Sequence, residues 1–270
     1  MKSNLIVQMF AFLLLGFLLA CSDDEGPTTV DPKTVDPKED TTIISTDKLE
    51  TIRFVSNGKN WEAKIWIPAE YETNKDLPSI YLVDDEEQHY PVATDEFEQV
   101  IAGCKQISGL DVLVITVADL DPNMNVVSDF QEFYDIYNDL ISYVETSYTT
   151  NDSRTLIGRG SAASMVLATL FMEEQETTVF QNFIATAVPG LGYFNEIVVK
   201  GDFPQAKANK KLHFSLDGES NYELNMKFIN TLNEKAYPWL EFGWSEYPDL
   251  HFTNSYPTAY ADGIKFIFEE

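Results

Sequence analysis

The sequence predicts an α/β fold with a mostly parallel central sheet, an N-terminal antiparallel hairpin and helices on both faces. Short, continuous apolar runs at residues 79–83 and 112–117 are typical of strands buried on both faces of a parallel sheet. From there on, strand-like runs alternate with helix-like segments, which is the pattern of βα units joined by right-handed crossovers.

The hairpin is predicted at the start of the folded domain. Residues 51–55 and 61–68 alternate between apolar and polar side chains, as half-buried strands do. Asn57 and Gly58 lie between them and form a favourable turn dipeptide.

The remaining elements follow from periodicity. Residues 130–148 give the clearest helix, because apolar side chains recur there at intervals of three and four. Further strands are predicted at residues 154–157, 182–187 and 211–216, and further helices at 97–107, from Ser161 onward, at 222–233 and at 259–268. In such a fold the functional residues lie at the carboxyl ends of the strands.

The N-terminal region reads as a leader and a tether. Lys2 precedes an apolar stretch that ends in Leu18-Leu19-Ala20-Cys21, the order of a signal peptide. The stretch is too short to cross a hydrocarbon core of about 30 Å. A cysteine directly after the cleavage site resembles the lipobox of bacterial lipoproteins, so we expect acylation of Cys21 and a lipid-anchored protein at the outer membrane or cell surface.

The domain plan follows from this leader. We expect a signal peptide at residues 1–20, an acidic, proline-containing linker at 21–48 and one folded domain at 49–270. The acidic residues after Cys21 resemble the surface-export signals of Bacteroidetes lipoproteins.

Charge and cysteine usage exclude several function classes. A formal net charge of −26 repels nucleic acid, so we expect no nucleic-acid partner. With Cys21 acylated, Cys104 has no disulfide partner and is most simply a small core residue. No clustered histidines and cysteines indicate a metal site, and we expect neither a metal nor a cofactor. The oligomeric state stays open.

Three segments carry a resemblance to a known family. Residues 66–71 (WIPAEY) and 77–84 (LPSIYLVD) match the family's opening motif, and residues 251–268 match its closing segment through Pro257, Ala259, Asp262, Gly263, Ile264 and Lys265. From residue 50 to 270 the chain resembles the esterase D family of α/β hydrolases, which includes S-formylglutathione, feruloyl and enterochelin esterases. The resemblance implies an α/β-hydrolase fold and an ancestral serine–histidine–acid site.

The expected nucleophile turn departs from the family pattern. The stretch GRGSAAS, residues 158–164, follows a strand and precedes a helix, where small residues are needed two positions before and after the serine. Placing Gly158 at the first small position puts Gly160 in the seat of the serine. The alternative register makes Ser161 the nucleophile but places Arg159 at the crowded position two before it.

The base and acid are assigned through the resemblance. His251 lies where the family has its general base, whereas His213 lies in an apolar strand and His89 in the loop after residue 83. Glu219, shortly after the strand at 211–216, fits best as the acid that orients His251. Asp217 is the other candidate.

The expected oxyanion loop also departs from the pattern. The chain has Asp84-Asp85-Glu86-Glu87 where the family has Asp-Gly, and negative side chains such as Asp85 and Glu86 oppose the stabilisation of an oxyanion. Arg159 could offset this charge or anchor a carboxylate ligand. It could equally pair with a nearby acid.

Three hypotheses follow. In the first, the chain is a non-catalytic or very weak relative of the esterases that binds a small-molecule or glycan ligand, or a partner protein. In the second, it is an active ester hydrolase acting on a carbohydrate or siderophore ester with Ser161, His251 and Glu219. In a third, His251 activates water directly in the space left by Gly160.

Overall fold

The eight-stranded sheet and its covering helices match the fold class that the sequence predicts. The computed structural model describes residues 46–83, 96–118, 120, 124–173, 178–201 and 209–269, which belong to one compact unit. The strand order is β1-β2-β4-β3-β5-β6-β7-β8. Strands β1, β2 and β4 pair antiparallel, and the other neighbouring strands pair parallel.

The elements have the following bounds. The strands are β1 (Lys48–Ser56), β2 (Lys59–Ile67), β3 (Ser79–Val83), β4 (Leu113–Val117), β5 (Arg154–Arg159), β6 (Asn182–Thr186), β7 (Lys210–Asp217) and β8 (Leu240–Tyr247). The helices are η1 (Ala69–Glu72), α1 (Glu96–Cys104), α2 (Phe130–Ser147), α3 (Ser161–Met172), α4 (Gly192–Lys200), α5 (Tyr222–Lys235) and α6 (Phe252–Phe268).

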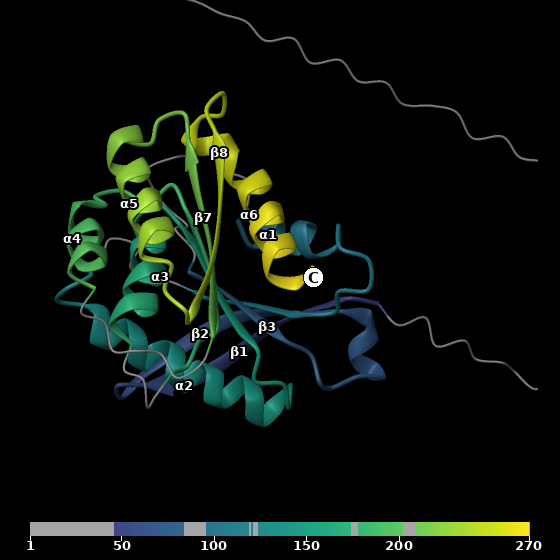
Figure 1. Cartoon of the computed structure of the whole chain (residues 1–270). Helices are drawn as coiled ribbons and strands as arrows, with labels where there is room; N and C mark the ends of the chain where they lie inside the picture. Colours follow the sequence, from purple (N-terminus) through teal and green to yellow (C-terminus); the bar gives the residue numbers. More distant parts are fainter. Residues whose placement is uncertain are drawn as a thin grey trace, which may run out of the picture. The chain divides into compact units, whose positions relative to one another are not determined.

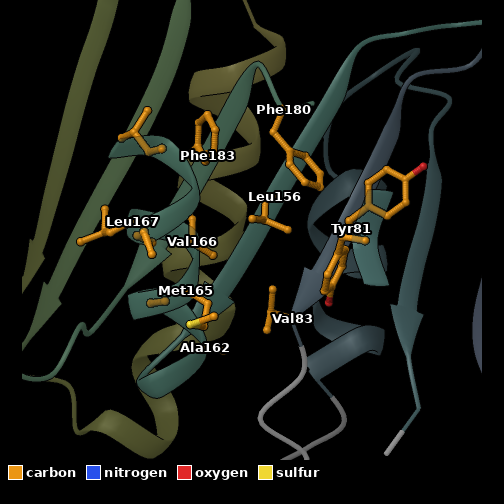
Figure 2. Packing of buried hydrophobic residues seen from close by; sticks show 14 of the residues in the cluster. Tyr81, Val83, Leu156, Ala162, Met165, Val166, Leu167, Phe180 and Phe183 are labelled. Carbon is orange, nitrogen blue, oxygen red and sulfur yellow. The ribbon is translucent and has the colours of Figure 1, made fainter. Parts of the chain in front are cut away.

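Two apolar layers enclose the sheet. Helices α2, α3, α4 and α5 cover one face, and α1 and α6 cover the other (Figure 1). Because side chains alternate along a strand, Leu156 of β5 packs toward α3 whereas Ile157 packs toward α6. Figure 2 shows α3 packed on the first face through Ala162, Met165 and Val166.

The structure adds elements that periodicity missed. Strand β8 lies at the edge of the sheet and has no fully buried side chain, so it lacks the continuous apolar run of an inner strand. Helix α4 is short and was not predicted. Helix α6 begins at Phe252, seven residues before the predicted start at Ala259, and it contains Pro257. The imidazole of His251 stabilises this earlier start, because it caps the helix by accepting a hydrogen bond from the Thr253 amide.

Two of the predicted core residues are buried as expected. Cys104 is 1% exposed, and burial raises the pKa of its thiol to about 12. His213 is 4% exposed on β7, with its ring near Phe266. Neither side chain is open to a ligand.

A buried ion pair joins three elements at the amino edge of the sheet. Lys210 Nζ lies 2.5 Å from Glu173 Oε2, and both side chains are almost fully buried. Glu173 also accepts hydrogen bonds from the Tyr134 hydroxyl and from the Val179 amide. The pair therefore holds the end of α3 to the starts of β6 and β7.

Several predictions fall outside the described residues. These are the signal peptide, the acylated Cys21 and its linker, the acidic segment with Asp85 and Glu86, and His89. Among the described residues, no helix is long and apolar enough to cross a membrane. These predictions stay predictions.

Candidate functional site

The candidate site lies at the topological switch point of the sheet. Strand β4 lies on one side of β3 and strand β5 on the other, and the helices α1 and α3 cover opposite faces of the sheet. A crevice at the carboxyl ends of the strands is expected at such a point. The turn after β5 contains Gly160.

Gly160 has a backbone conformation that favours glycine. Its φ is 59° and its ψ is −128°, and it directly precedes α3. Its N–H donates to the carbonyl oxygen of Thr186 at the end of β6, with an N···O distance of 3.0 Å. The sharp strand-to-helix turn thus has its tip at residue 160.

Gly158 makes the close contact between the strand and the helix. A Cβ at this position would lie 3.0 Å from the carbonyl carbon of Ala162 and 3.2 Å from its Cβ. The small residues that the turn requires are therefore Gly158 before its tip and Ala162 after it.

Ser161 is the first residue of α3 and is partly exposed. Within the described parts of the chain, its hydroxyl has no hydrogen bond to His251 or to another side chain. The imidazole nitrogens are instead bonded elsewhere.

The structure brings His251 and Glu219 together. His251 Nε2 lies 2.8 Å from Glu219 Oε1, and the two side chains are about half exposed, at 51% and 53%. On the other side of the ring, Nδ1 accepts a hydrogen bond from the Thr253 amide at 3.2 Å and lies 2.9 Å from the Thr253 hydroxyl. Because a backbone amide can only donate, Nδ1 is unprotonated and Nε2 carries the proton that goes to Glu219.

This bonding differs from that of a working triad. There, the acid binds the Nδ1–H group and Nε2 faces the nucleophile. Here Nε2 faces the acid. His251 is the N-cap residue of α6, and its Nδ1 accepts the capping hydrogen bond. Neither nitrogen is directed to a serine.

Asp217 stabilises the loop that carries Glu219. Its Oδ1 accepts hydrogen bonds from the amides of Glu219 and Ser220, at 3.0 and 2.8 Å, and from the Ser220 hydroxyl. Asp217 is 5% exposed, and the Ser255 hydroxyl of α6 lies 3.5 Å from its Oδ2. Of the two acids considered for His251, Glu219 contacts the ring, and Asp217 supports the loop beneath it.

Arg159 is buried beneath the turn and paired with an acid. Its Nη2 and Nε lie 2.5 and 2.7 Å from Glu96 Oε1, and its side chain is 3% exposed. A ligand at the surface therefore meets other groups first. Glu96, the first residue of α1, was not singled out in the sequence, since one more acid among many gives no signal.

No metal centre is found in the part of the chain that the structure describes. No group of three histidine, cysteine, aspartate or glutamate side chains there is arranged to hold an ion. A cavity of about 760 Å³ lies elsewhere, along α2 beside Arg154 and Glu173, and none of the predicted site residues lines it.

Solved structures with the same fold include a serine hydrolase, siderophore hydrolases and a feruloyl esterase module. An IroE-like serine hydrolase from Shewanella oneidensis is 20% identical, with a TM-score of 0.66, and the match covers 82% of this chain and 80% of that one. The siderophore hydrolase EstA from Aspergillus nidulans is 13% identical, with a TM-score of 0.58, over 81% of this chain and 93% of that one. A feruloyl esterase module from Clostridium thermocellum is 12% identical, also with a TM-score of 0.58, over 83% and 89%.

These neighbours show the fold of this chain. Its chemistry has to be inferred from its own residues. No protein-family model matches the sequence, and no curated protein matches it. The chain thus has the esterase-like α/β-hydrolase fold that the sequence resemblance implies.

Proposed function

We propose that this chain, which has the α/β-hydrolase fold of esterases, binds a ligand at the carboxyl edge of its sheet and does not hydrolyse it at an appreciable rate. The observation that carries the proposal is the turn after β5. Its tip is Gly160, with φ 59° and ψ −128°, and glycine offers no hydroxyl for attack on a carbonyl.

The packing around the turn supports this register. Gly158, two residues before Gly160, makes the tight contact with Ala162 that keeps strand and helix close together. If Ser161 were the nucleophile, that contact would fall to Arg159, whose long side chain is buried in an ion pair with Glu96.

The orientation of His251 supports it as well. A general base must have a free nitrogen within hydrogen-bond reach of the proton that it removes. His251 uses Nδ1 to cap α6 and Nε2 to bind Glu219. Losing the serine of a triad alone costs on the order of a million-fold in rate.

The names of the neighbours suggest a ligand class. They include siderophore hydrolases and a feruloyl esterase. We propose that this chain binds an ester of one of these two types. Calorimetric titration with a feruloyl ester and with a ferric siderophore tests it. Saturable binding to one of them supports the proposal, and the absence of binding to both removes this ligand class.

One observation favours a second candidate, an active serine ester hydrolase. His251 and Glu219 are 2.8 Å apart, as a base and its orienting acid would be, and Ser161 lies partly exposed at the start of α3. Activity would require the imidazole ring to turn over, so that Nδ1 binds Glu219 and Nε2 faces Ser161. Such a turn would break the hydrogen bond from Thr253.

An ester assay with three variants separates the two candidates. We expect the purified chain to show no turnover of short p-nitrophenyl esters above the uncatalysed rate, and the Ser161→Ala variant to match it. The Gly160→Ser variant should not gain hydrolysis by itself, because neither imidazole nitrogen of His251 is free to act as a base. It should also lose roughly 1–3 kcal/mol of stability, because a serine is strained at this φ and ψ.

Two outcomes would contradict the proposal. Turnover by the parent chain that disappears in Ser161→Ala would establish Ser161 as the nucleophile. Turnover by the parent chain that persists in Ser161→Ala and disappears in His251→Ala would show that His251 activates water directly.

A further inference from the structure

We propose that Arg159 is a positioning residue: together with Glu96 it fixes the turn that carries His251, and so sets the orientation of the imidazole ring. This inference goes beyond the proposed function. It concerns the orientation of the imidazole ring and does not depend on which ligand the chain binds.

The guanidinium group of Arg159 connects the starts of α1 and α6 to the turn after β5. Arg159 is the last residue of β5 and directly precedes Gly160. Its Nε and Nη2 both contact Glu96 Oε1, at the start of α1. The pair therefore ties the turn to the first residue of α1.

The same guanidinium group reaches the start of α6. Its Nη1 lies 3.4 Å from the carbonyl oxygen of Phe252, and its central carbon lies 4.4 Å from the centre of the Phe252 ring. The Tyr256 ring, one turn further along α6, lies 4.6 Å away. Two aromatic rings of α6 therefore pack on the buried cation at cation–π distances.

A second contact joins Glu96 to the same helix. The Tyr260 hydroxyl donates to Glu96 Oε2 at 2.5 Å, and Tyr260 is fully buried. Residues 252, 256 and 260 thus present one face of α6 to the Arg159–Glu96 pair, as the spacing of four residues requires.

His251 directly precedes this anchored face. Its contact with Glu219 joins two half-exposed side chains, and such surface pairs contribute little and do not hold a geometry by themselves. The backbone at Phe252, in contrast, is held by buried contacts. The ring orientation of His251 therefore depends on where the buried pair places the first turn of α6.

Arginine suits this role better than lysine. A planar guanidinium group can bond Glu96 along one edge, bond a carbonyl at another corner and stack on aromatic rings at the same time. A lysine could keep the ion pair, but its ammonium group has no flat face to stack on Phe252 and Tyr256.

The test measures the imidazole of His251 directly. The protein contains three histidines, so ¹⁵N–¹H correlation spectra contain only a few imidazole signals. Comparison with a His251→Gln variant assigns the signals of His251. In the parent we expect the Nδ1 signal of a nitrogen that accepts a hydrogen bond. We expect the Thr253 amide, which donates to Nδ1, to be protected from hydrogen exchange.

The decisive variant removes both charges of the pair. In Arg159→Met/Glu96→Gln no buried charge is left without its partner, so the fold is retained. We expect the two nitrogen signals of His251 to move toward each other as the tautomers average. The Thr253 amide should exchange at least about tenfold faster.

A matched control pair lies at the opposite edge of the sheet. Glu173→Gln/Lys210→Met removes an equally buried pair, so it reproduces the general loss of stability without touching α6. His251 and Thr253 should keep their parent signals there. The proposal is overturned if the Arg159 variant leaves His251 and Thr253 unchanged, or if both pairs change them equally.

A single substitution keeps the test decisive if the double variant fails to fold. Arg159→Lys retains the charge beside Glu96, and we expect it to shift the His251 signals in the same direction by a smaller amount. Unchanged signals in this folded variant would also overturn the proposal. Neither the His251 signals nor the exchange of the Thr253 amide depends on an ester assay. The proposed function can therefore be wrong while this inference holds, and the reverse.

Discussion

At the scale of single residues, burial decides what each titratable side chain does. His213 is 4% exposed on β7, and its Nε2 lies 3.1 Å from the Ser245 hydroxyl. Its Nδ1 faces Gly263, where a Cβ would approach within 3.2 Å. Desolvation lowers the pKa of His213 from 6.5 to about 4, although the charge of Asp262 opposes the shift.

This lowered pKa predicts a loss of stability in mild acid. Between pH 6.5 and 4 the unfolded chain binds a proton at this histidine and the folded chain does not, so the free energy of unfolding falls as the pH falls through that range. From pH 7.5 to 5 the loss from this residue is about 2 kcal/mol. Urea unfolding of the parent and of His213→Gln at both pH values measures it.

The difference between the two proteins isolates this residue from the many carboxyl groups. We expect His213→Gln to lose less stability than the parent on acidification. Equal losses in parent and His213→Gln would contradict the prediction.

At the scale of elements, two loops approach each other closely where the acid meets the imidazole. The Gly218 amide donates to the carbonyl oxygen of Leu250 at 2.9 Å, which joins the loop after β7 to the loop after β8. A Cβ on Gly218 would lie only 2.3 Å from the carbonyl oxygen of Pro248. Glycine is therefore required for this contact, and Glu219 and His251 are its neighbours on the two loops.

We expect Gly218→Ala to separate the two loops and to cost about 1–3 kcal/mol, the usual cost of forcing an extra carbon into a packed site. Urea unfolding gives the cost. The imidazole signals of His251 should also change, because its contact with Glu219 depends on this spacing.

The matched control is Gly192→Ala at the start of α4. A Cβ there meets nothing within 4 Å, so this variant should be neutral or slightly stabilising. A Gly218→Ala variant as stable as Gly192→Ala would refute the close approach.

At the scale of the whole molecule, the chain combines one compact α/β unit with a strongly acidic composition and a predicted lipid anchor. The net charge of −26 disfavours contact with nucleic acid and with anionic membrane surfaces. We propose that the protein is held at the cell envelope by the lipid on Cys21 and not by its charge. A linker rich in proline and acidic residues would keep the folded domain away from the bilayer.

We expect Cys21→Ala to abolish membrane attachment when the chain is expressed in a bacterium with its own leader. Detergent-phase partitioning measures this, because acyl chains carry a protein into the detergent phase. Cys104→Ala is the control, since its thiol lies in the core at 1% exposure and its removal should leave partitioning unchanged. A parent chain that stays in the aqueous phase would contradict the prediction.

Much of the fold could be predicted because its signals are local. Strands β3 and β4 are continuous apolar runs, and the predicted helix at residues 130–148 is α2 to within one residue. Strand β8 escaped prediction because an edge strand buries little, and the first turns of α6 escaped it because they are held by a cap from His251 and by contacts with Arg159. Both depend on contacts with distant segments.

The candidate site was predicted in its parts and not in its arrangement. The sequence by itself determined that a glycine stands between Arg159 and Ser161, and that His251 and Glu219 belong to loops at the carboxyl edge of the sheet. Only the tertiary structure decided that Nδ1 of His251 caps α6 and that Arg159 is buried against Glu96. The order of small residues in a turn is a local steric property, whereas the bonding of a ring nitrogen or a buried charge depends on segments that folding brings together from far apart in the chain.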